Sequence, residues 1–174
     1  MLPCLARCRD LDGGPHHGET VFEHCLMTGD ALFSSRPLLR FAGYLHDAGK
    51  FDARQIQNGS ITFHGHEKET SHIQRDLESL RFSREEQEYI LSRIHMHMRP
   101  LTGETSPKAV RRLLAALQKN HVDYRDFMRM RIADKKANLA KAPYTISEIR
   151  IPFPKYGFVC KSCIMNAMEQ RGSG

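Results

Sequence analysis

A histidine and an aspartate stand side by side at the end of a segment that is apolar on almost every side of a helix. The pair is His46 and Asp47, and the segment covers residues 37–48. This pattern predicts a central and largely buried helix, with Gly49 marking its end. An imidazole and a carboxylate cost several kcal/mol when they are buried without partners. The pair therefore predicts a bound cation or a dense hydrogen-bond network at this helix end.

Apolar residues recur at helical spacing through most of the remaining chain, and no stretch alternates as a strand does. Helices are expected over about residues 19–33 and 67–80, from Ser83, from Pro107, and over about 122–140. The predicted fold class is all-α, a compact bundle of about six or seven helices. We expect an irregular N-terminal segment at residues 1–18, one helical domain at 19–142, and a C-terminal extension at 143–174 that packs on the domain or flanks it.

The overall charge favours an anionic partner. A formal net charge of +6 at pH 7 and a pI near 9.2 suit a nucleotide, a nucleic acid or another phosphoester, although a basic soluble enzyme explains the same balance. No apolar run is long enough to span a membrane, and the first residues do not resemble a signal peptide. We therefore expect a cytoplasmic protein without a membrane partner.

Several of the ten histidines fall where a helix face can turn inward. His24 lies beside the main apolar stripe of its helix, on a half-apolar second face, so an inward and a surface placement fit equally well. His66 aligns with the apolar stripe of the helix at 67–80 and is expected to face the core. His95 and His97 lie on opposite borders of one stripe, so at most one of them can face a common centre. Periodicity does not choose between them.

A carboxylate also interrupts the apolar stripe of the last long helix. Asp134 needs a partner there, and that partner is either an arginine, such as Arg129 or Arg131, or a metal ion. The other nitrogen and oxygen ligands at inward or helix-end positions are His24, His46, Asp47, His66 and one of His95 and His97. Mixed imidazole and carboxylate ligands suit one or two divalent ions of Mn, Fe, Ni, Co or Mg. Six such ligands suit two ions bridged by one aspartate, for which Asp47 is the candidate.

The order of these motifs resembles the HD-domain phosphohydrolase superfamily. The matching residues are His24, the run Leu-His-Asp-Ala-Gly-Lys that contains His46 and Asp47, and Asp134 in Arg-Ile-Ala-Asp-Lys-Lys-Ala. The resemblance covers about residues 19–140. It is closer still to the HD domain attached to bacterial tRNA nucleotidyltransferases (CCA-adding enzymes) and related poly(A)-polymerase-like proteins, through residues 21–24, 63–67 and 97–100.

The resemblance implies a metal-dependent phosphohydrolase. By this likeness His24, His46, Asp47 and Asp134 ligate metal, and the additional histidines are His66 and His97, which selects His97 over His95. Only 23 residues precede His24, too few for a nucleotidyltransferase head, so a stand-alone hydrolytic domain is expected at residues 19–142. The implied activity is that of a phosphodiesterase or phosphatase acting on a nucleotide or RNA-end phosphoester, such as a 2′,3′-cyclic phosphate.

Basic residues near the motifs are candidates for contacts with the substrate. Lys50 could hold a phosphate oxygen in the transition state, or it could be a solvated cation near a helix end. Arg99 is a second candidate for the catalytic machinery. Arg131 and Lys135, with their basic neighbours Arg129 and Lys136, could guide a nucleic-acid end to the site.

Two other functions remain open at this point. One is a 5′-nucleotidase, a nucleoside monophosphatase with a single metal held by His24, His46, Asp47 and Asp134. The other is a non-catalytic module that binds RNA or a partner protein through its basic surface, which has no need of a complete ligand set.

The cysteines allow a separate metal site. Cys4 and Cys8, near the start of the chain, and Cys160 and Cys163, near its end, have spacings that a four-thiolate structural zinc site can use. Free thiols are the alternative.

Overall fold

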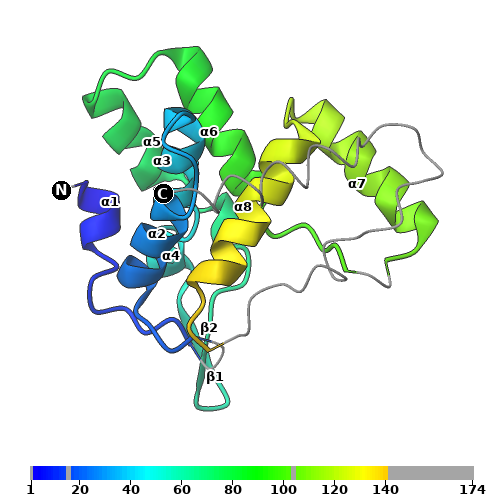
Figure 1. Ribbon diagram of the computed structural model, residues 1–174. Helices are drawn as coiled ribbons and strands as arrows, with labels where there is room; N and C mark the ends of the chain where they lie inside the picture. Colours follow the sequence, from blue (N-terminus) through cyan, green and yellow to red (C-terminus); the bar gives the residue numbers. More distant parts are fainter. Residues whose placement is uncertain (1, 15–16, 103–104, 141–174) are drawn as a thin grey trace, which may run out of the picture.

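Helices make up nearly all of the regular structure in the computed structural model, which describes residues 2–14, 17–102 and 105–140 (Figure 1). The longer helices are α2 (Val21–Asp30), α3 (Pro37–Leu45), α5 (Ser71–Ser79), α6 (Arg84–Met96), α7 (Pro107–Lys119) and α8 (Tyr124–Ala137). Single turns form α1 (Pro3–Ala6), α4 (Lys50–Ala53) and the 3-10 helix η1 (His66–Lys68). Strands β1 (Gln55–Gln57) and β2 (Ser60–Thr62) pair as one antiparallel hairpin. The all-α fold class is confirmed.

The chemistry at the helix starts explains where these elements begin. The side chains of Thr20 and Ser83 each accept a hydrogen bond from the backbone three residues on, and the glutamate at that position bonds back to the cap. Helices α2 and α6 therefore both begin in a complete capping box. Pro37 and Pro107 occupy the first turn of α3 and α7, where a missing N–H costs no helical hydrogen bond. The expected helix starts at Ser83 and Pro107 are confirmed.

Helix α3 lies at the centre of the bundle, as its apolar surface predicts. It packs against α2, α6 and α8, and Leu39 and Leu45 are almost inaccessible to solvent. Gly43 allows α2 to approach closely, because a Cβ there would lie 3.1 Å from Gly29 Cα of α2 and 2.6 Å from Leu32 Cδ1 just beyond it. This close packing brings His46, at the end of α3, beside His24 of α2, with 5.1 Å between the ring centroids.

Helix α7 packs on a second, smaller apolar cluster. Its Val110, Leu113 and Leu117 belong to this cluster together with Met96 at the end of α6 and Phe127 of α8. In the view of Figure 1, α7 lies on the opposite side of α8 from α1 and α2. The second cluster therefore supports the end of α6 and the first half of α8, the two helices that lead to His97 and Asp134.

The described N-terminal segment is irregular, as expected, apart from one helical turn. It contains the single turn α1, and Cys4, Leu5 and Cys8 belong to the main apolar core. The Cys4 backbone N–H donates to the buried Asp76 Oδ2 at 2.8 Å, which fastens α1 to α5. A four-residue turn is too short to produce a periodic pattern, so the sequence carried no sign of it. Residues 143–174, expected to form an extension, lie outside the described residues.

Two expected helices are shorter than their patterns suggested. The helix expected at 37–48 ends at Leu45, and the chain then turns through His46 and Asp47 into α4. In place of the single helix expected at 67–80, the chain forms η1 followed by α5. Gly49 does not end α3 in a left-handed conformation, since its φ is −66°. It is required instead for close approach, because a Cβ there would lie 2.2 Å from the His66 carbonyl oxygen. No described helix has both the length and the apolar character needed to cross a membrane.

Candidate metal centre

Six side chains from five parts of the fold meet beyond the end of α3. They are His24 of α2, His46 and Asp47 after α3, His66 of η1, His97 at the end of α6, and Asp134 of α8. The first five residues are at most 5 % exposed, whereas the Asp134 side chain is 37 % exposed. These are the six candidate ligands identified in the sequence. His95, the alternative to His97, is exposed on the surface of α6.

Asp47 divides the histidines into two groups, one at each of its oxygens. Its Oδ2 lies 3.5 Å from His46 Nε2 and 3.8 Å from His24 Nε2. Its Oδ1 lies 2.9 Å from His66 Nε2 and 3.4 Å from His97 Nε2. The ligand atoms of each group, Asp47 included, lie within 4.8 Å of one another, so each group could hold a metal ion. The geometry thus provides two adjoining sets of donors that share one carboxylate.

Three of the histidines are held in the same way. His46, His66 and His97 each direct Nδ1 at the carbonyl oxygen of the residue three positions earlier, at 2.8, 2.9 and 2.6 Å. A carbonyl accepts only from a protonated nitrogen, so these contacts assign the proton to Nδ1. Nε2 of each ring then faces Asp47: a protonated Nε2 donates to the carboxylate, and a neutral ring offers its Nε2 lone pair to a bound ion. His46 Nε2 is buried without a hydrogen-bond partner among the described residues, which fits a nitrogen whose partner is a metal ion.

The electrostatics of the cluster keep both carboxylates ionised. Burial alone would raise the pKa of Asp47, but His46, Lys50 and the hydrogen bonds from His66 and His97 hold it well below its usual range. Burial would likewise raise the pKa of Asp134, but a 3.0 Å hydrogen bond with His24 Nε2 and the nearby His46 lower it to about 2. Burial also lowers the pKa of His46 to about 4, so this ring is neutral at pH 7 and able to ligate a metal.

Comparison with protein-family models matches the HD domain over residues 16–140, well over half of the chain. The chain belongs to the HD-domain family. HD domains are in general metal-dependent phosphohydrolases, and the two donor sets around Asp47 agree with that chemistry. Neither the curated proteins nor the solved structures searched gave a match. The closer relation to tRNA nucleotidyltransferases expected from the motifs therefore has no support from these comparisons.

Lys50 of this HD domain is buried, so the interpretation of it as a solvated cation is wrong. It is the first residue of α4, it is 6 % exposed, and its Nζ lies 2.8 Å from Asp47 Oδ2. Burial would lower the pKa of Lys50, but pairing with Asp47 raises it, so the ammonium stays charged. The site therefore contains a permanent positive charge next to the carboxylate that both histidine groups share.

The other basic candidates lie farther from the cluster. Arg99 is exposed after the end of α6. Arg131 of α8 donates to the carbonyl oxygens of Arg99 at 3.0 Å and Leu101 at 3.1 Å, so its guanidinium fastens the loop that follows His97. Lys135 is half-buried beside Asp134. The expected contacts of these three residues with a substrate remain predictions, and for Arg131 the structure provides a positioning role instead.

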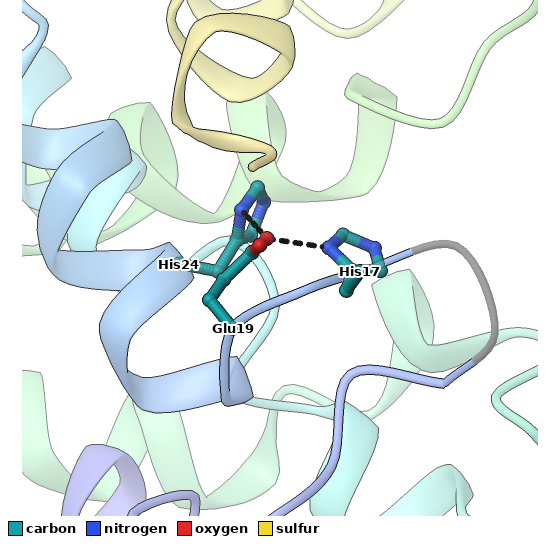
Figure 2. Close-up of side chains that lie close together, drawn as sticks. All are labelled: His17, Glu19 and His24. Carbon is teal, nitrogen blue, oxygen red and sulfur yellow. Dashed lines mark hydrogen bonds and ion pairs between the residues drawn. The ribbon is translucent and has the colours of Figure 1, made fainter. Parts of the chain in front are cut away.

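Two residues of the centre escaped the sequence analysis, His17 and Glu19. Glu19 Oε1 accepts a hydrogen bond from His17 Nδ1 at 2.8 Å and lies 3.0 Å from His24 Nδ1, as Figure 2 shows. The Glu19 side chain is 1 % exposed. The capping box at Thr20 could have revealed it, because a helix that begins at Val21 leaves Glu19 in the preceding loop, free to turn back toward His24.

The structure gives no support to a zinc site at the cysteines. Cys4 and Cys8 are free thiols buried in the apolar core, and Cys8 Sγ donates to the Ala48 carbonyl oxygen. Burial raises the pKa of the Cys8 thiol to about 11, which opposes the thiolate form that zinc needs. The other half of the expected site, Cys160 and Cys163, lies outside the described residues.

Proposed function

We propose that this HD domain hydrolyses a phosphodiester with two divalent ions. His24, His46 and Asp134 would hold one ion together with Asp47 Oδ2, and His66 and His97 would hold the other together with Asp47 Oδ1. The observation that carries the proposal is the division of the four histidines between the two oxygens of Asp47, at 2.9 to 3.8 Å. One carboxylate shared between two donor sets is the usual way to hold two ions close together.

Bound divalent ions supply Lewis-acid polarisation of the phosphoryl group and lower the pKa of water toward neutrality. The protein residues supply orientation and charge. The Nδ1 contacts of His46, His66 and His97 fix the ring orientations before substrate arrives. Lys50 is held beside Asp47 and carries the positive charge that a phosphoryl oxygen needs as negative charge develops on it.

The proposed substrate is a nucleotide or RNA-end diester such as a 2′,3′-cyclic phosphate. A diester has a poor leaving group and gains most from two ions that stabilise the entering and the leaving oxygen. The net charge of +6 favours an anionic substrate of this kind.

A single-metal 5′-nucleotidase is the second candidate, and two contacts of His66 favour it. His66 Nε2 lies 2.9 Å from Asp47 Oδ1 and 3.3 Å from His97 Nε2, which are hydrogen-bonding distances. His66 and His97 would in that case orient Asp47 and bind no ion of their own.

The deciding experiment compares two substrates and two variants. Hydrolysis of 2′,3′-cyclic AMP and of 5′-AMP is measured with Mn²⁺, Ni²⁺, Co²⁺ and Mg²⁺ for the wild type, His97→Ala and His95→Ala. His95 is the matched control, because it lies on the same helix but is exposed. We expect higher kcat/KM for the cyclic diester, lost in His97→Ala and kept in His95→Ala. A preference for 5′-AMP with every metal would favour the nucleotidase, and no hydrolysis of either would favour a binding module.

A further inference from the structure

Glu19 is a buried carboxylate whose two oxygens have different partners. Its Oε2 accepts the backbone N–H of Gly18 and of Leu139, both at 3.0 Å, so the side chain is held between the loop before α2 and the segment after α8. Its Oε1 faces two imidazoles, accepting from His17 Nδ1 at 2.8 Å and lying 3.0 Å from His24 Nδ1 (Figure 2). No lysine or arginine is paired with Glu19 among the described ion pairs.

His24 differs from the other histidines of the centre in how its Nδ1 is placed. His46, His66 and His97 stand at helix ends or turns, and each directs Nδ1 at a carbonyl oxygen of its own segment. His24 lies inside α2, where the carbonyl oxygens accept the hydrogen bonds of the helix itself. Its Nδ1 is buried and has no well-aligned hydrogen-bond partner among the described residues, so Glu19 Oε1 is the acceptor within reach.

We propose that Glu19 is a positioning residue of the metal centre, which accepts the Nδ1 proton of His24 and so holds the His24 Nε2 toward Asp47 and Asp134. His24 Nε2 lies 3.8 Å from Asp47 Oδ2 and 3.0 Å from Asp134 Oδ1 on the opposite side of the ring from Glu19. This inference rests on the proposed metal function and adds a residue to it. A carboxylate behind a metal-ligating imidazole fixes the ring and raises its basicity.

The same carboxylate links the centre to Lys50 through His17. With its Nδ1 proton donated to Glu19, His17 offers the Nε2 lone pair, which lies 3.5 Å from Lys50 Nζ. Glu19 thus orients two imidazoles, one that faces the metal ligands and one that faces the ammonium paired with Asp47. The bonds from Gly18 and Leu139 keep Glu19 itself in place.

Calorimetric titration with Mn²⁺ tests the proposal on the full chain. Glu19→Gln should weaken Mn²⁺ binding about 10- to 100-fold, the usual cost of losing such a partner of a metal-ligating histidine. Glu23→Gln is the matched control, since it makes the same substitution at an exposed glutamate in the first turn of α2. Glutamine can complete the capping box at that position. The control should bind Mn²⁺ like the wild type. Equal affinities for Glu19→Gln and Glu23→Gln would overturn the proposal.

A second measurement uses only the wild type, so it does not depend on whether a variant folds. Nitrogen-15 NMR of histidine-labelled, metal-free wild type should show a proton on His24 Nδ1, whether or not Nε2 is also protonated. A His24 ring with no proton on Nδ1 would refute the role of Glu19. The metal function and the role of Glu19 can be refuted independently. A wild type that binds no Mn²⁺ contradicts the metal function, while the NMR result still decides whether Glu19 orients His24.

Discussion

Replacing Asp126 with alanine should destabilise the fold more than any single exposed ion pair could. Asp126 of α8 is 1 % exposed and accepts hydrogen bonds from Tyr89 Oη at 2.7 Å and Arg93 Nη2 at 3.3 Å, both on α6. Arg36 and Arg129 approach its other oxygen, each at 3.1 Å. The carboxylate therefore ties α8 to α6, the helices that carry Asp134 and His97.

Only one of the three arginines would be left buried without a carboxylate partner. The side chains of Arg36 and Arg129 are 40 % and 25 % exposed and can turn to water, whereas that of Arg93 is 5 % exposed. Removing one partner of a buried pair costs about 3 to 5 kcal/mol, so Asp126→Ala should lose roughly that amount. Such a loss is a large part of the total stability of a domain, which is about 5 to 15 kcal/mol.

Asp30 provides the control, because it too binds a tyrosine and an arginine but lies at the surface. Tyr44 Oη lies 2.5 Å and Arg40 Nη2 2.9 Å from Asp30 Oδ1, but the Asp30 side chain is 69 % exposed. Asp30→Ala should therefore cost only about 0 to 1 kcal/mol. Urea unfolding followed by circular dichroism measures both variants, with unchanged m-values as the check on two-state behaviour. Losses for the two variants within about 1 kcal/mol of each other would refute the argument from burial.

Three further predictions concern the metal centre and its surroundings. In the metal-free protein, the lowered pKa of Asp134 contributes stability that is present above its ordinary pKa of 3.8 and is lost as the pH falls toward 2. Asp134→Asn should therefore make the unfolding free energy depend less on pH in that window. An unchanged acid unfolding curve would contradict this. Gly49→Ala should cost about 3 kcal/mol in urea unfolding, because the His66 carbonyl oxygen is too close for a Cβ, and a wild-type midpoint would show that the turn can relax. Lys50→Met should lower kcat roughly 100-fold with little change in KM, whereas a change in KM alone would assign Lys50 to ground-state binding.

Periodicity and capping chemistry predicted most of the fold. The capping box at Ser83 and the proline at position 107 marked the helix starts, and the apolar surface of residues 37–48 identified the central helix. The helix ends were harder, because His46 and Asp47 keep helical spacing although the chain has already left α3. The turn at Gly49 depends on a carbonyl oxygen of η1, a contact that spacing along the sequence does not encode.

The six candidate ligands were found because each combines a ligating side chain with an inward or helix-end position. His97 was chosen over His95 by resemblance, and its 5 % exposure agrees with that choice. His17 and Glu19 were missed because they lie in a loop, where no period marks the inward side. Pairing Arg131 with the loop after α6 requires knowing which helices touch, so charge alone suggested a substrate contact there. Lys50 and Asp47 are only three residues apart, but the burial that turns their pair into part of the centre comes from the packing around it.

The number of metal ions held by the purified protein tests the central claim most directly. Elemental analysis of wild type after equilibration with Mn²⁺ should give close to two ions per chain, because Asp47 presents one oxygen to each of two histidine groups. His66→Ala should retain about one ion and Asp47→Ala should retain none. A single ion in the wild type, unchanged in His66→Ala, would contradict the two-ion account, and a wild type without metal would contradict the metal centre itself.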